Sequence, residues 1–182
     1  MFKLRSIFLS VIILFGAVAC QKPSNESIPI PPAPTRSYTS DEIKTLMLMD
    51  GVYAPNLALP DTTYLMPTKS WIEKEFSQGL AAFQFQMGID KWSSESNDCD
   101  KFAIAASFYC KWLNHSSPNR KYSAGIACGE IYYIRDAGGG HAINFFLTSD
   151  GDKIKTVFYE PQTRMIVALS ENEKSRIFFY KL

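Results

Sequence analysis

The sequence predicts an α+β domain, with helices first and a meandering antiparallel sheet after them. Two observations lead to this prediction. A segment near the middle of the chain is apolar on nearly every side, as in a buried helix. The stretches after Asn114 alternate apolar and polar residues between turn signals, as strands do. We therefore expect a buried central helix with the strands packed around it.

Three helices are expected in the first part of the domain. The first runs from Asp41 to Met49 with Ser40 as its N-cap. Prolines then break the chain into loops, until a second helix runs from Lys69 or Ser70 to Phe85. The third and most apolar helix covers 98–113 and is predicted to be the most buried helix.

Five strands are expected in the second part, at 124–135, 141–148, 154–159, 165–169 and 176–180. A turn at 149–152 joins the second and third strands into a hairpin. Alternate residues of each hairpin strand share a face: His141, Ile143, Phe145 and Leu147 on one strand, and Ile154, Thr156, Phe158 and Glu160 on its partner.

The amino terminus has the pattern of a secretory signal. Lys3 and Arg5 precede a short apolar run, which predicts a signal peptide over residues 1–19. The stretch Ala17-Val18-Ala19-Cys20 resembles the bacterial lipobox, and this resemblance implies lipidation of Cys20 and cleavage just before it.

A proline-rich and polar segment follows the lipidation signal. Residues 20–40 have almost nothing apolar to bury and are predicted to form a tether between the membrane and a single domain at 41–182. Gln21 is not the aspartate that marks inner-membrane retention in many Gram-negative species. We therefore expect a lipid-anchored protein of the cell envelope, placed in the outer membrane and facing the periplasm or the surface.

Composition excludes one class of partner. The net charge is +1 and comes from interspersed acidic and basic residues. Because no basic stripe is present, the sequence does not indicate nucleic-acid binding.

The cysteines divide into two groups. Lipidation of Cys20 leaves three thiols in a compartment that favours disulfides. Cys110 and Cys128 lie in apolar segments and could either pair or stay buried as inert thiols. Cys99 is left over, in a polar setting that is unusual for a structural cysteine.

Cys99, His141 and Glu160 have the properties of a nucleophilic site. If Asp98 caps the third helix, Cys99 stands in its first turn, where the helix dipole favours a thiolate. His141 follows three glycines at the start of a strand and could act as general base. Glu160 could hydrogen-bond the far ring nitrogen and orient it. The competing interpretation is a structural cysteine, a strand histidine and a solvated carboxylate.

These residues resemble the papain-like cysteine hydrolases, most closely the papain-like protease domain of the Marasmius oreades agglutinin and more distantly the NlpC-type peptidases. The resemblance is carried by Trp92, Asp98-Cys99-Asp100-Lys101-Phe102-Ala103, Gly139-Gly140-His141-Ala142-Ile143-Asn144 and Glu160-Pro161-Gln162. It implies a papain-like fold, in which the cysteine opens the buried central helix and an antiparallel sheet follows.

The resemblance also implies roles for individual residues. Cys99 would be the nucleophile, His141 the general base and Glu160 the orienter, with Asn144 as an alternative orienter. The chemistry itself needs no cofactor, but a calcium or manganese ion beside the cysteine is implied. Its ligands would be Asp98, Asp100 and Gln162, and Trp92 would move when the ion binds. Asp98 and Asp100 are equally explained as the cap and a first-turn acid of the helix.

Two hypotheses of different classes follow. In the first, the chain is a membrane-anchored thiol hydrolase that cleaves peptide or amide bonds, in proteins or peptidoglycan, by a Cys-His-Glu mechanism. In the second, it is a non-catalytic binding module of the cell envelope that keeps the same fold.

Overall fold

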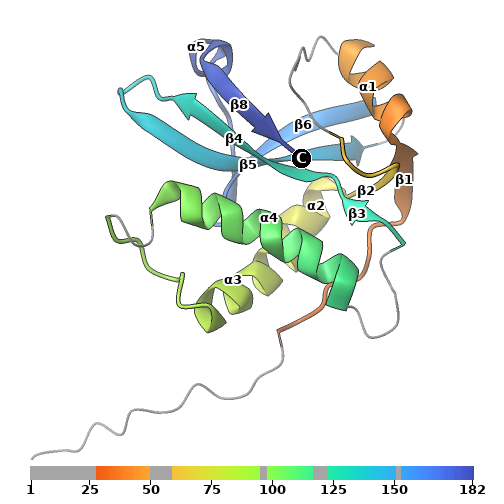
Figure 1. Cartoon of the computed structure of the whole chain (residues 1–182), viewed down its shortest axis with the longest axis horizontal. Helices are drawn as coiled ribbons and strands as arrows, with labels where there is room; N and C mark the ends of the chain where they lie inside the picture. Colours follow the sequence, from red (N-terminus) through yellow and green to blue (C-terminus); the bar gives the residue numbers. More distant parts are fainter. Residues whose placement is uncertain (1–27, 50–58, 95–97, 117–122, 151–152) are drawn as a thin grey trace, which may run out of the picture.

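The computed structural model describes residues 28–49, 59–94, 98–116, 123–150 and 153–182 (Figure 1). The predicted signal peptide (1–19), the lipidation site Cys20 and the first part of the predicted tether lie outside these described residues. Within the described ranges, none of the helices combines the length and apolar character needed to cross a membrane.

The chain alternates between strands and helices more than the sequence predicts. In chain order the elements are β1 (Arg36–Thr39), α1 (Ser40–Met49), β2 (Thr63–Met66), α2 (Lys69–Trp71), the π-helix η1 (Ile72–Phe76), α3 (Ser77–Gln86), α4 (Cys99–Ser116), β3 (Gly125–Ile126), β4 (Cys128–Ile134), β5 (Gly140–Asp150), β6 (Lys153–Glu160), β7 (Met165–Val167), α5 (Glu171–Ser175) and β8 (Ile177–Lys181).

These strands form two sheets. The larger one is antiparallel, with five strands in the order β7-β6-β5-β4-β8. The smaller one has the order β1-β2-β3, in which β1 and β2 are antiparallel and β2 and β3 are parallel. Figure 1 shows α4 along one face of the larger sheet, with α3 beside it.

The larger sheet is covered on both faces. On the helical side, Phe146 of β5 belongs to a cluster with Phe76 and Tyr109. On the other side, Phe145 belongs to a second cluster with Ile43 of α1. Each large apolar side chain buried in these clusters stabilises the fold by roughly 1.5–3 kcal/mol. The two cores make β5 a rigid central strand, and this strand carries His141.

The β5–β6 hairpin agrees with the prediction. Phe145 pairs with Phe158, and Leu147 pairs with Thr156. The residues expected on one face of each strand therefore lie on a common face of the sheet. This part of the strand prediction is confirmed.

The predicted order of helices first and sheet afterwards is wrong. β1 precedes α1, β2 separates α1 from α2, and α5 lies between β7 and β8. The prolines around these segments predict tether at β1 and loop at β2, and each strand is only four residues long. β2 is a strand because it pairs with β3, about sixty residues later in the chain.

The helix predicted at 98–113 is α4, but it is not buried on all sides. Phe102, Ala106 and Tyr109 are buried in the core. Ile104 and Phe108, one turn apart on another face, are 48% and 53% exposed. The all-round apolar pattern therefore reflects two apolar faces, and only one of them meets the core.

The described part of the predicted tether lies against the domain. The Trp71 indole donates a hydrogen bond to the Pro32 carbonyl (2.7 Å), and the Tyr109 hydroxyl donates one to the Pro29 carbonyl (3.0 Å). Gly79 allows this approach, since a Cβ there would lie 2.0 Å from the Tyr109 hydroxyl oxygen. Residues between Ile28 and Ala33 therefore pack against the domain.

Candidate functional site

His141 and Glu160 meet at one end of the β5–β6 pair. His141 is the second residue of β5, Glu160 is the last residue of β6, and Nε2 of the imidazole lies 2.7 Å from Oε2 of the carboxylate. Both side chains are largely buried. The other carboxylate oxygen, Oε1, accepts a hydrogen bond from the backbone NH of Gln162 (3.0 Å). The Glu160 carboxylate is thus held at both oxygens.

Tyr133 forms one side of this pair. It lies opposite His141 in the β4–β5 ladder, and the two rings meet edge-on with centroids 5.7 Å apart. Burial raises the pKa of Tyr133 to about 12, and the negative charges of Glu173 and Glu160 add to the effect. The phenol is therefore neutral at physiological pH.

Cys99 is the first residue of α4 and is partly buried. A negative charge on Cys99 contributes to the raised pKa of Tyr133 and also to that of Tyr132, so the thiol lies within electrostatic reach of both rings. No hydrogen bond joins Cys99 to His141 within the described part of the chain. The structure therefore brings His141 and Glu160 into contact, and the role of Cys99 is still a prediction.

Asn144 faces the other side of β5. Its Nδ2 donates to the Ala103 carbonyl (2.9 Å), the Ser107 hydroxyl (3.1 Å) and the Gly129 carbonyl (3.2 Å). These bonds connect β5 to α4 and β4. His141 and Asn144 are three positions apart on the strand, so their side chains point to opposite faces. It is the Glu160 carboxylate that contacts the imidazole.

Two carboxyl groups flank Cys99. Asp98 and Asp100 share a hydrogen bond, which lowers the pKa of Asp98 and raises the pKa of Asp100. The Lys101 ammonium lies 3.3 Å from Asp98 Oδ1. Within the described residues, no group of three or more His, Cys, Asp or Glu side chains converges as a metal site. Two adjacent carboxylates supply oxygens that suit calcium, and Lys101 at present balances part of their charge.

Trp92, predicted to respond to such an ion, is 61% exposed. It lies in none of the helices or strands. It is therefore not a core residue, and its indole is accessible to solvent.

Cys110 and Cys128 are buried free thiols. Burial raises the pKa of Cys128 well above its ordinary value, and a hydrogen bond with Cys110 adds to the effect. The two thiols are therefore neighbours between α4 and β4. Of the two alternatives predicted for them, the structure has the unpaired one.

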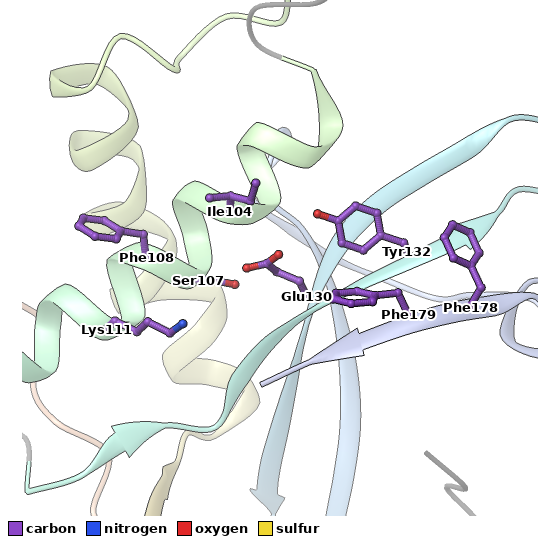
Figure 2. A pocket seen from close by; sticks show the side chains of 8 residues that line it. All are labelled: Ile104, Ser107, Phe108, Lys111, Glu130, Tyr132, Phe178 and Phe179. Atoms are coloured by element: carbon purple, nitrogen blue, oxygen red, sulfur yellow. The ribbon is translucent and has the colours of Figure 1, made fainter. Parts of the chain in front are cut away.

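A groove that the sequence does not predict lies between α4 and the β4–β8 edge of the larger sheet (Figure 2). It has a volume of about 600 Å³. The helix contributes Ile104, Ser107, Phe108 and Lys111. The sheet contributes Glu130, Tyr132, Phe178 and Phe179. The spacing of Ile104, Phe108 and Lys111, four and then three residues apart, was the available signal, because it places them on one helix face.

The fold and these two sites can be compared with known proteins. The chain belongs to the family described as the ricin-type beta-trefoil lectin C-terminal domain, whose model matches residues 39–179. No significant match was found among curated proteins.

Solved lectin structures are similar to this chain. One is PSL1a in complex with E64, with a TM-score of 0.58 and 24% identity over 80% of this chain and 51% of that chain. Another is the Polyporus squamosus lectin bound to the human-type influenza-binding epitope Neu5Acα2-6Galβ1-4GlcNAc, with a TM-score of 0.55 and 23% identity over 80% and 49% of the two chains. At these identities the likeness concerns the fold alone, and this chain spans about half the length of these lectins.

The comparisons correct the interpretation made from the sequence. The predicted resemblance to papain-like cysteine hydrolases, with the papain-like fold class, is overturned by the lectin family match and the lectin structures. The descriptions of the chain as a cysteine peptidase and as a hydrolase are wrong for the same reason. The resemblance rested on short motifs around Cys99, His141 and Glu160, whereas the family match covers 39–179.

Proposed function

We propose that this chain is a lipid-anchored glycan-binding module of the bacterial cell envelope. The observation that carries the proposal is the match of residues 39–179 to a lectin family. The solved complex of the Polyporus squamosus lectin with a sialylated trisaccharide supports glycans as the ligand class. Of the two hypotheses drawn from the sequence, the binding module fits these comparisons better than the thiol hydrolase does.

The proposed location depends on the amino-terminal segment. The stretch Ala17-Val18-Ala19-Cys20 supports lipidation of Cys20, and the proline-rich segment behind it supports a tether. Gln21 supports outer-membrane placement. We expect the wild-type chain to incorporate a labelled fatty acid and to fractionate with the outer membrane. A Cys20→Ala variant should do neither, and an unlipidated wild-type chain in the soluble fraction would contradict the anchor.

Glycan binding is tested directly with the purified full chain in detergent on a glycan array, followed by calorimetry with the best ligand. We expect saturable binding to a restricted set of glycans. Binding should persist in a Cys99→Ser variant, because sugar recognition does not need a thiol. Absence of binding to every glycan on a broad array would contradict the proposal.

A second candidate function is covalent chemistry at the Cys99 thiol. The observation that favours it is the 2.7 Å contact between His141 and Glu160, beside Tyr133, whose pKa is also raised by the charge of Cys99. An imidazole held in this way can take a proton from a thiol. A similar lectin, PSL1a, has been solved in complex with E64. This candidate concerns thiol reactivity and does not include peptide-bond cleavage.

E64 also provides the test, because it is an epoxide. A thiolate opens the ring by forming a C–S bond and breaking a C–O bond, and the alkoxide takes up a proton. We expect the mass of one E64 molecule to be added to the wild-type chain, on the peptide that contains Cys99. His141→Ala should slow the addition, and addition at an equal rate in that variant would contradict the candidate.

A further inference from the structure

We infer that the groove between α4 and β8 binds a quaternary ammonium group, a nitrogen cation that carries only alkyl groups. The groove volume of about 600 Å³ is within the usual range of small-ligand sites, roughly 300–1,000 Å³. None of the residues Cys99, His141 and Glu160 lines it. The inference is independent of the proposed glycan binding, so each of the two can fail without the other.

Three aromatic rings form the sheet side of the groove. The ring centroid of Tyr132 lies 5.2 Å from that of Phe179 and 6.5 Å from that of Phe178. In the β4–β8 ladder, Tyr132 lies opposite Phe179 and Tyr133 opposite Ile177, so Phe178 is an extra residue in β8. This bulge lets the neighbours Phe178 and Phe179 both line the groove (Figure 2).

These rings are accessible to a ligand. Phe178 is 63% exposed and Phe179 is 44% exposed. A cluster of exposed apolar side chains of this kind marks a binding surface. The face of an aromatic ring carries partial negative charge and attracts a cation within roughly 6 Å of the ring centroid. The aromatic wall therefore offers both apolar contact and electrostatic attraction to an organic cation.

A buried carboxylate lies between this wall and α4. Glu130 is two residues before Tyr132 on β4, on the same face of the strand, and is only 6% exposed (Figure 2). Within the described part of the chain, Glu130 forms no ion pair. A buried charge without an opposite charge is costly. A cationic ligand in the groove would supply the missing partner.

The surrounding charges also favour a cation. Burial raises the pKa of Tyr132 to about 12, and the negative charges of Glu130, Asp100 and Cys99 add to the effect. The aromatic wall therefore lies in a negative potential, which attracts cationic ligands. Lys111 also lines the groove, but it is exposed on α4, and a lysine ammonium at the surface stays in water.

The chemistry of the wall favours an alkylated ammonium over a primary one. A primary ammonium group has three N–H donors, and the phenylalanine rings offer them no ordinary acceptor. Enclosing such a group would leave donors unsatisfied, which costs free energy. A quaternary ammonium has no N–H group to satisfy, and its alkyl groups can pack against the rings.

The test measures binding of choline to the full chain by calorimetry, in a detergent without ammonium groups. Two compounds serve as controls: dimethylbutanol, in which a tert-butyl group replaces the trimethylammonium group, and ethanolamine, the primary amine. We expect choline to bind about tenfold or more tightly than either. Absence of choline binding, or equal affinity for choline and dimethylbutanol, would overturn the inference. Equal affinity for ethanolamine would overturn the quaternary assignment.

Variants locate the binding in the groove. Glu130→Gln should weaken choline binding about tenfold or more, because the amide carries no charge. Phe179→Leu should weaken it about threefold or more, because leucine keeps apolar surface but has no aromatic face. Lys111→Gln should bind choline at least as tightly as the wild type, since a like charge is removed. Phe85→Leu, which replaces an exposed ring on α3 outside the groove, should bind as the wild type does.

The variants also separate the possible failures. Wild-type affinity in both Glu130→Gln and Phe179→Leu would place choline outside the groove and overturn the inference. Weaker binding by Lys111→Gln would overturn the assignment of a cation. Circular dichroism checks the fold of each variant. Because Phe179 and Lys111 are exposed, their replacements test the groove even if Glu130→Gln does not fold.

Discussion

The imidazole Nε2 of His141 lies 2.7 Å from the carboxylate Oε2 of Glu160, although the two residues are 19 positions apart in the chain. The backbone NH of Gln162 holds the second carboxylate oxygen. Since Nε2 is occupied by this contact, Nδ1 is the ring nitrogen that can accept a proton from another group. The pair therefore has the geometry of an oriented base.

We predict that Glu160→Gln slows alkylation of Cys99 by iodoacetamide at pH 7 by roughly 10-fold to 100-fold. The amide cannot stabilise a positively charged imidazolium, so His141 becomes a weaker base. The rate is measured by peptide mass spectrometry, with the buried thiols Cys110 and Cys128 as unreactive internal references. Glu171→Gln, on α5, is the matched control. Equal rates in both variants would argue against a base role for the pair.

Asn144 is predicted to contribute to stability. Asn144→Ala removes three buried hydrogen bonds between β5 and its neighbours and should lower the free energy of unfolding by about 1–3 kcal/mol. Asn144→Asp should cost more at neutral pH, because a buried carboxylate would face two carbonyl oxygens and only the Ser107 hydroxyl could donate to it. Urea denaturation at pH 7 and pH 5 tests this. The Asp variant should recover part of its stability at the lower pH, and an Asp variant as stable as the wild type would refute the prediction.

Stability should fall at alkaline pH because of two tyrosines. Burial raises the pKa of Tyr132 and of Tyr133 to about 12, whereas an unfolded tyrosine titrates near 10. Between about pH 10 and pH 12 the folded state then holds more protons than the unfolded state, so stability decreases as the pH rises. Below about pH 9 these groups have no effect. Thermal unfolding from pH 8 to pH 11.5 should show the decline, and Tyr133→Phe should make it shallower; a midpoint unchanged to pH 11.5 would contradict the prediction.

The cation predicted beside Cys99 is tested by calcium titration. If Asp98 and Asp100 bind calcium, a concentration about 100 times the dissociation constant should stabilise the fold by about 2.7 kcal/mol. Asp98→Asn and Asp100→Asn should each abolish the effect, whereas Asp136→Asn, near α5, should retain it. Thermal unfolding and Trp fluorescence provide the two readouts. No change in either at millimolar calcium would leave Asp98 and Asp100 as ordinary acids at the start of α4.

α4 and the β5–β6 hairpin show best how far local sequence patterns predict this fold. The apolar pattern at 98–113 correctly predicts a helix, and the alternation in β5 and β6 predicts the paired residues Phe145 and Phe158. Both signals arise between residues close in sequence. The same apolar pattern wrongly predicts that Phe108 is buried, because composition cannot show which helix face meets another element.

Of the two candidate sites, one could be predicted from local sequence and the other could not. Cys99, His141 and Glu160 could be selected from the sequence because each has a chemically distinctive local setting. The groove could not, since Phe178 and Phe179 look like ordinary strand residues. They point into a common space only because β8 pairs with β4 through a bulge.

Local sequence patterns correctly predict the positions of the main helices and the β5–β6 hairpin, because each depends on short-range periodicity. The lipoprotein-like amino terminus rests on a contiguous motif and stays a prediction. Tertiary structure alone decided the parallel pairing of β2 with β3, the contact of residues 28–33 with the domain and the opening between α4 and β8. These features join residues far apart in the chain. Their formation depends on the burial of apolar surface shared between distant segments, which no local pattern encodes.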